Sequence, residues 1–81
     1  MNVHVLLFAS ARDLAGRSDV PLELPAGATV AELREALRQA APALAPVLAT
    51  LHVAINSDYA SNEDVIPPGA EVACFPPVSG G

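Results

Sequence analysis

The chain has 81 residues, of which 52% are hydrophobic and only 16% are charged. This length allows one small domain, and the composition is too apolar for a disordered chain. The net charge of −5 argues against nucleic acid as a partner, because phosphates require a basic surface. One cysteine excludes an internal disulfide, and no apolar stretch is long enough to span a membrane, so we expect a cytoplasmic protein.

The first half of the chain predicts two strands and a helix. Residues 3–9 form a nearly continuous apolar run, which is typical of a central strand covered on both faces. Residues 10–19 are polar and predict a loop. Residues 20–24 alternate between apolar and polar side chains, which indicates a half-buried strand, and its proline suggests an edge position.

The main helix is predicted from its two ends. Thr29 and Glu32 have the spacing of a capping box, so a helix should begin there, and Pro42 should end it. Val30, Leu33 and Leu37 recur with helical spacing and form its apolar face.

The second half predicts a short helical segment and further strands. Residues 42–51 combine helically spaced leucines with prolines, which indicates a short second helix or a 3₁₀ turn. Residues 52–56 and 71–75 predict strands, and residues 59–60 a brief pairing partner. The main helix supplies the crossover that a parallel pairing of the first and last strands requires.

This order of elements predicts an α+β fold of the β-grasp, or ubiquitin-like, type. We expect a mixed sheet of four to five strands, one main helix and a short second helix. The β-grasp domain should occupy residues 1–75, and residues 76–81 should form a flexible C-terminal tail that ends in Gly-Gly.

Inside the predicted domain the signals for catalysis or metal binding are weak. The sequence contains no motif typical of nucleotide-binding proteins, zinc proteases or serine hydrolases. His4 and His52 are better explained as surface or hydrogen-bonded residues than as metal ligands, and Cys74 as a buried structural thiol. We therefore expect the domain to bind no metal and no cofactor.

The chemistry is predicted to reside in the tail. Two prolines stiffen its base, and Gly80 and Gly81 remove side-chain bulk from its tip, so that the tip can thread a narrow channel of another protein. The Gly81 carboxylate is ionised at neutral pH and can attack the α-phosphate of ATP. The resulting acyl adenylate can be displaced by a sulfur nucleophile, and none of these steps needs a catalytic side chain on the small protein itself.

Residues 75–81, Phe-Pro-Pro-Val-Ser-Gly-Gly, resemble the terminal motif of the small, sulfur-carrying subunits of molybdopterin synthase. Residues 8–16 resemble the first strand and following loop of that family, and residues 53–60 resemble its middle strand and the partner of that strand. The resemblance runs from Val3 to Gly81.

The resemblance implies a sulfur-transfer cycle. An E1-like adenylyltransferase, which uses ATP, would activate Gly81, and a sulfur donor such as a cysteine desulfurase or rhodanese-like protein would convert it to a thiocarboxylate. The charged tail would enter the large subunit of molybdopterin synthase, which holds the active site, within a heterotetramer. Sulfur would pass there to cyclic pyranopterin monophosphate and form the molybdopterin dithiolene.

The same cycle assigns roles to the residues of the tail. Gly81 is the expected reacting residue, and Ser79 and Gly80 are expected to thread the partner's channel. An apolar collar at the base of the tail is expected to dock on the large subunit and consists of Phe75, Pro76, Pro77 and Val78.

Three alternatives share parts of this pattern. A sulfur carrier of thiazole synthesis has the same fold and tail, but the length of residues 10–19 argues against it. A ubiquitin-like modifier would be joined to lysines of other proteins. A plain binding module with an irrelevant tail would tolerate the loss of Gly81.

Overall fold

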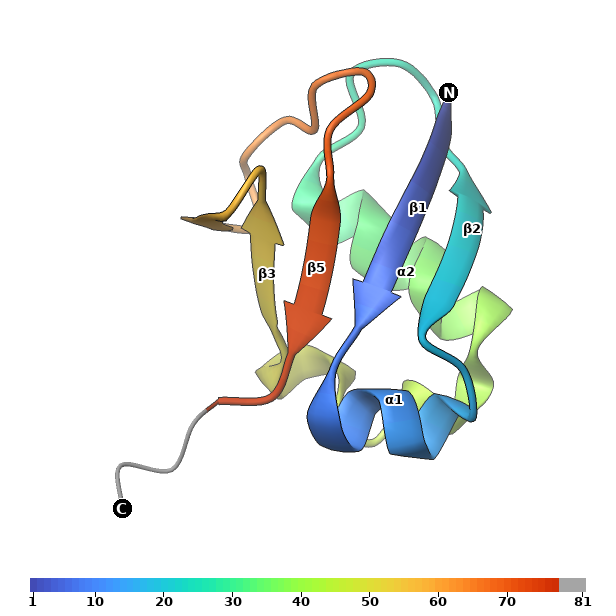
Figure 1. Ribbon diagram of the computed structural model, residues 1–81. Coiled ribbons are helices and arrows are strands. Elements are labelled where there is room, and N and C mark those ends of the chain that lie inside the picture. Colours follow the sequence, from blue (N-terminus) through green and yellow to red (C-terminus); the bar gives the residue numbers. More distant parts are fainter. Residues whose placement is uncertain (78–81) are drawn as a thin grey trace.

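The computed structural model of the protein describes residues 1–77, and Figure 1 shows a sheet with a helix behind it. The sheet has five strands in the order β2-β1-β5-β3-β4. Their bounds are β1 (Asn2–Leu7), β2 (Asp19–Glu23), β3 (His52–Ile55), β4 (Asp58–Ala60) and β5 (Val72–Phe75). β1 and β5 pair in parallel, and the other neighbours are antiparallel. The predicted β-grasp fold with a mixed sheet is therefore confirmed.

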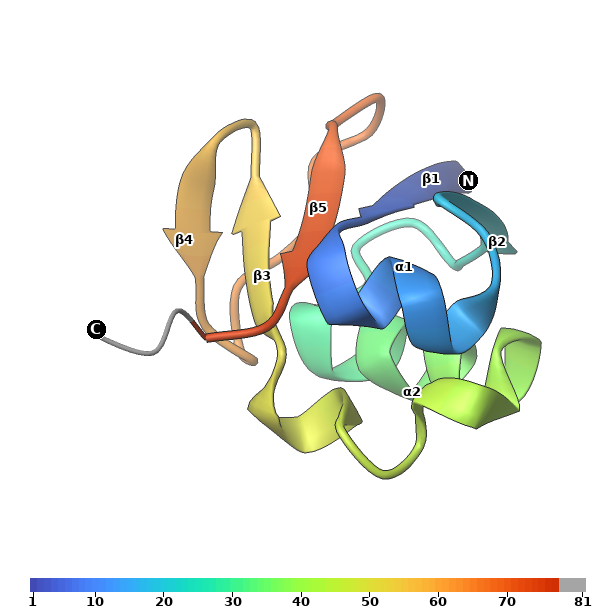
Figure 2. The same ribbon diagram turned by 60° about the horizontal axis from the view of Figure 1, so that its bottom comes forward.

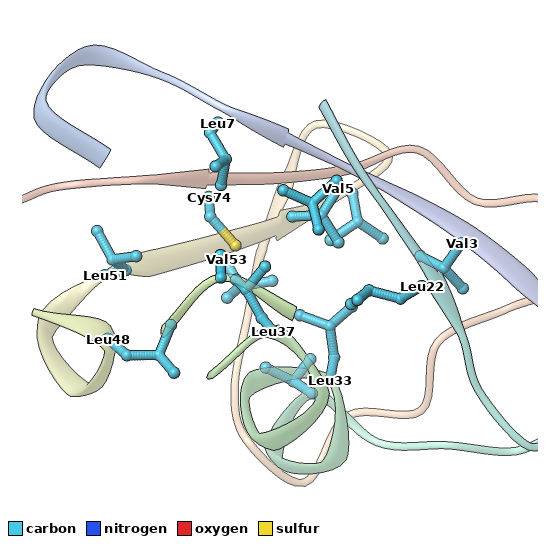
Figure 3. Close-up of a cluster of buried hydrophobic side chains, with 14 of the residues drawn as sticks. Val3, Val5, Leu7, Leu22, Leu33, Leu37, Leu48, Leu51, Val53 and Cys74 are labelled. Atoms are coloured by element: carbon cyan, nitrogen blue, oxygen red, sulfur yellow. The ribbon is translucent and has the colours of Figure 1, made fainter. Parts of the chain in front are cut away.

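The main helix, α2 (Val30–Ala40), begins where the sequence predicts. Thr29 and Glu32 form the full capping box, in which the Thr29 hydroxyl accepts from the Glu32 amide and the Glu32 carboxylate accepts from the Thr29 amide. Leu33 and Leu37 are fully buried and point toward the sheet, where they meet the side chains of β1, β2 and β3 (Figure 3).

The segment after α2 forms two 3₁₀ turns, in agreement with the prediction for residues 42–51. These turns are η1 (Pro42–Leu44) and η2 (Leu48–Thr50). Their leucines are buried and extend the core below the sheet. Within residues 1–77, no helix is both long and apolar enough to cross a membrane.

A further helix replaces the loop that the sequence predicts over residues 10–19, so that prediction was wrong. α1 (Ala9–Ala15) follows β1 directly, lies below the lower ends of the strands in Figure 1 and comes to the front in Figure 2. Ala11 is completely buried, and Gly16, with a φ of 75°, ends the helix by donating from its amide to the Arg12 carbonyl at 2.9 Å. The helix has no side-chain N-cap, which removes the signal that identified α2.

The expectation that the first strand is covered on both faces was also wrong. Val3, Val5 and Leu7 are buried, whereas Asn2 and His4 on the opposite face of β1 are exposed. α2 covers one face of the sheet, and no helix lies on the other face among the residues that are described (Figure 1). β1 has a neighbour on each side, but the middle strand is β5, and β2 lies at the edge as predicted.

Candidate functional site

β5 has a paired strand on each side close to the point where it ends. β5 pairs with β1 on one side and with β3 on the other. The Phe8 amide also donates to the Cys74 carbonyl at 3.2 Å, one residue before the strand ends. Pro76, half-buried, and Pro77, exposed, follow Phe75. The chain therefore leaves the sheet from a fixed point.

Four residues of the predicted site, Val78, Ser79, Gly80 and Gly81, lie outside the described residues. Their assigned roles in docking, threading and reaction remain predictions, as does the boundary between a domain and a tail at residue 75.

Phe75 belongs to a cluster of three aromatic rings on the open face of the sheet. The His52 ring lies 5.6 Å from that of Tyr59 and 5.7 Å from that of Phe75, and the Tyr59 and Phe75 rings are also 5.7 Å apart, all between centroids. Cross-strand pairing explains this arrangement, because His52 pairs directly with Phe75, and Tyr59 pairs with Ala54 on the same face. We call His52, Tyr59 and Phe75 the aromatic cluster.

The cluster is accessible to a partner. The Tyr59 side chain is 73% exposed and Phe75 is half-buried, so neither residue belongs to the core. Phe8, 46% exposed, lies beside β5 through its hydrogen bond to Cys74. Exposed aromatic side chains on an otherwise unpaired sheet face are typical of interaction surfaces.

Sequence reasoning identified Phe75 as a site residue but missed Tyr59, His52 and Phe8. The strand register contains the signal that would have found them. Once β3 is aligned antiparallel to β5, alternation places His52 opposite Phe75 and sends both side chains to the face that lacks α2.

Cys74 lies on the other face of β5, and its thiol is buried, as predicted. Its side chain points toward Val53 in the core (Figure 3) and is only 1% exposed. Burial raises the pKa of the Cys74 thiol to about 11, so the thiol stays protonated at neutral pH.

The two histidines lie on the open face and do not meet. His4 is paired with Asp19 of β2 through its Nδ1 at 3.2 Å from the carboxylate oxygens, and His52 belongs to the aromatic cluster. Within residues 1–77, no three histidine, cysteine or acidic side chains are grouped so that they could hold a metal ion.

A hollow of about 270 Å³ lies on the helical side of the molecule, between α2 and η2. The charged groups that line it are already paired. Arg34 donates to the Asn62 side chain and to the Leu48 carbonyl, each at 2.8 Å. Arg38 donates to Glu35, and this bond lowers the pKa of the Glu35 carboxyl. The charged side chains that line the hollow are therefore paired by hydrogen bonds within the fold.

Comparison with known proteins identifies similar chains along the whole sequence. The profile of the ThiS family matches residues 5–81. The molybdopterin synthase sulfur carrier subunit of Chlamydomonas reinhardtii is 39% identical over 83 aligned residues and covers 100% of both chains. The protein with the same description from Haemophilus influenzae is 41% identical and covers 98% of this chain and 99% of its own.

A solved structure shares the fold over its whole length. Small archaeal modifier protein 1 from Haloferax volcanii is 32% identical, has a TM-score of 0.87 and covers 100% of both chains.

Proposed function

Because the chain belongs to the ThiS family, we propose that it is a sulfur carrier and that it serves a molybdopterin synthase. The observation that carries this proposal is the match to molybdopterin synthase sulfur carrier subunits over the full length of both chains. The family match extends to Gly81, the residue that the proposal makes reactive.

In the proposed cycle the chain supplies a carboxylate and its partners supply the catalysis. An E1-like adenylyltransferase binds ATP and joins the Gly81 carboxylate to AMP. A sulfur donor of the cysteine desulfurase or rhodanese-like class provides the sulfur that displaces AMP and leaves a thiocarboxylate. The carrier binds no cofactor of its own, and the cycle runs in the cytoplasm.

The second half of the cycle takes place on the large synthase subunit. Ser79 and Gly80 thread the channel of that subunit, and Gly81 delivers sulfur to cyclic pyranopterin monophosphate, which becomes the dithiolene of molybdopterin. Small residues suit this role because they let a partner's backbone close around the tail.

The aromatic cluster supports a docking role for the sheet face beside the tail. Phe75 lies on this face and is followed directly by Pro76 and Pro77. Docking there would hold the chain at the point where the tail begins. Because the docked surface would lie next to the start of the tail, docking would restrict the positions that the tip of the tail can reach. This restriction favours the geometry that the reaction requires.

The position of the Gly81 carboxylate provides the test. One added residue moves the carboxylate by about 3.5 Å, and a misplacement of 1 Å can slow a positioned reaction about 100-fold. Deletion of Gly81 or addition of one residue should therefore abolish thiocarboxylate formation, and Gly81→Ala should slow it severely. Intact mass after incubation with ATP, an activating enzyme and a sulfur source reports the exchange of oxygen for sulfur as a gain of about 16 Da.

His4→Ala is the control for these variants, because it changes an exposed side chain of β1 and leaves the tail and its carboxylate in place. All variants should unfold at the same denaturant concentration as the parent, because none of them changes a side chain of the described core. A deletion variant that gains sulfur as fast as the parent would refute the carrier function.

Conjugation to other proteins is the second candidate function, and the similarity to an archaeal modifier protein favours it. A carrier and a modifier share the adenylation step and differ in the acceptor. Incubation of the activated chain with a cell extract separates them, because a modifier forms amide bonds to lysines of other proteins, whereas a carrier accumulates as the thiocarboxylate.

A further inference from the structure

The chain contains no lysine, because its four basic residues are all arginines. A guanidinium remains protonated and is not a nucleophile, whereas the neutral form of a lysine amine attacks activated acyl groups. Side-chain amines are therefore missing from a protein whose proposed function is to bear an activated acyl group at Gly81.

The thiol of Cys74, the only cysteine, is equally unable to react. Its side chain is 1% exposed, and β5 is held between β1 and β3 on either side of it. Burial raises the pKa of the thiol to about 11, so the reactive thiolate is scarce at neutral pH. An acyl group could reach Cys74 only if the sheet opened.

The Met1 amine is occupied by the fold. Its nitrogen donates to the Leu24 carbonyl and lies 3.5 Å from the Glu23 carboxylate, while the Leu24 amide donates to the Met1 carbonyl at 2.9 Å. These bonds continue the pairing of β1 with β2 by one further step, and the Met1 side chain is only 12% exposed. The nitrogen must leave both partners before it can attack an acyl carbon.

The remaining nucleophiles of the chain leave no stable product. Serine, threonine and tyrosine hydroxyls are weak nucleophiles unless a base activates them. His4 and His52 are exposed, but an acylated imidazole is hydrolysed by water and returns the original chain.

We propose that this protein is an acyl donor that cannot be its own acceptor, so that copies of the chain do not become joined through Gly81. The inference rests on the proposed activation of Gly81. In the excluded reaction an amine nitrogen would bond to the acyl carbon, the bond from that carbon to the phosphate oxygen would break, AMP would leave and the amine proton would pass to solvent. The activated chain is thus preserved for nucleophiles on other molecules.

A chemically activated chain tests this inference without an activating enzyme. The full chain is prepared with a C-terminal thioester at Gly81, held at high concentration at mildly alkaline pH, and followed by intact mass. Hydrolysis returns the parent mass, a linked pair has twice that mass less one water, and a ring closed on Met1 has the parent mass less one water. Because the thioester is installed chemically, this test is independent of whether adenylation occurs.

Arg12→Lys and Arg38→Lys are the matched variants, because each keeps the charge and places an amine at a side chain that is about half exposed, 54% and 51% respectively. We expect the parent to hydrolyse without linked pairs, and the double variant to form at least tenfold more of them. Free glycine methyl ester added to the parent should be acylated, which shows that the thioester is reactive.

Two results would overturn the inference. One is that the parent forms a linked pair or a ring as fast as the double variant forms linked pairs. Peptide mapping would then show whether the new bond lies at Met1 or elsewhere. The other is that the double variant forms no more linked pairs than the parent, although added glycine methyl ester is acylated. The absence of lysine would then not be what prevents the chains from joining.

Discussion

The two faces of the sheet carry different kinds of side chains. The covered face is aliphatic and meets α2, so that Val5, Leu33 and Leu37 lose all contact with water. The open face carries the aromatic cluster at one end and the paired His4 and Asp19 at the other. The apolar burial that stabilises the fold is therefore on one face, and the side chains of the other face remain available for contact with a partner.

The largest effect on stability is expected from Leu37→Ala on the covered face. Leu37 is 0% exposed, and its loss leaves a cavity between α2 and the sheet that the surroundings fill only partly. The free energy of unfolding should fall by about 3 kcal/mol, measured by urea denaturation. Tyr59→Ala is the matched control on the open face and should change it by less than about 1 kcal/mol, because Tyr59 is 73% exposed. Equal losses in the two variants would contradict the division between the faces.

The buried thiol of Cys74 should make the free energy of unfolding depend on pH. The folded state raises the pKa of the thiol from 9.0 to about 11, so the folded protein keeps a proton that the unfolded chain releases. The stabilising contribution is therefore complete below about pH 9 and is lost as the pH rises through about 11, by roughly 2–3 kcal/mol in total. Urea denaturation between pH 8 and about 11 measures the slope.

Cys74→Ala is the control for that slope, because it removes the thiol and leaves every other titrating group in place. Its stability should decline less steeply than that of the parent over the same pH range. Parallel curves for the two proteins would show that the thiol does not contribute.

Phe75→Ala tests the open face. The variant should weaken binding to the proposed partner, a large subunit of molybdopterin synthase, by about 2 kcal/mol, because aromatic anchors at the centre of an interface carry most of its binding energy. Titration calorimetry gives the affinity, and circular dichroism shows whether the domain stays folded. His4→Ala, at the other end of the same face, should bind as the parent does.

If Phe75→Ala does not fold, Tyr59→Ala tests the same docking surface. Tyr59 is more exposed than Phe75 and belongs to the same cluster, so its loss should weaken docking without loss of structure. Unchanged affinity in both variants, with intact folds, would place the docking surface elsewhere.

The elements that could be predicted from the sequence are those with a strong local signal. The capping box of Thr29 and Glu32 located the start of α2, and the alternation over residues 20–24 located β2. α1 was missed because it has seven residues and no capping side chain, and its helical form depends on the burial of Ala11. Local sequence cannot report a stabilisation that comes from tertiary packing.

The candidate site was only partly visible in the sequence for a related reason. Phe75 could be identified because it adjoins the tail motif. Tyr59 and His52 lie far from it in sequence and come together only through the register of β3 with β4 and β5. The apolar run of β1 also concealed which face would be open, because Leu6 and Phe8 look like core residues until α2 is placed.

The smallest expected effect comes from the hairpin that carries Tyr59 onto the open face. Asn56 and Ser57 join β3 to β4 in a two-residue turn, with φ values of 50° and 73°. Positive φ at both positions is what a type I′ turn requires, and Asn-Gly is its preferred pair. Ser57→Gly should therefore relieve strain and raise the free energy of unfolding by about 0.5 kcal/mol, a net value because glycine also gains freedom in the unfolded chain.

The affinity for the large subunit distinguishes Ser57→Gly from the substitutions on the open face. Ser57→Gly removes no atom of the aromatic cluster, so affinity for the large subunit should equal that of the parent while urea denaturation shows the gain in stability. The Asn56 side chain also accepts from the Glu71 amide at 3.0 Å, and this bond ties the turn to the start of β5. Asn56→Gly would lose that bond and is expected to lower stability, although it too favours a positive φ. A loss of affinity in Ser57→Gly with a stable fold would mean that the turn itself contacts the partner and that the docking surface extends beyond the cluster.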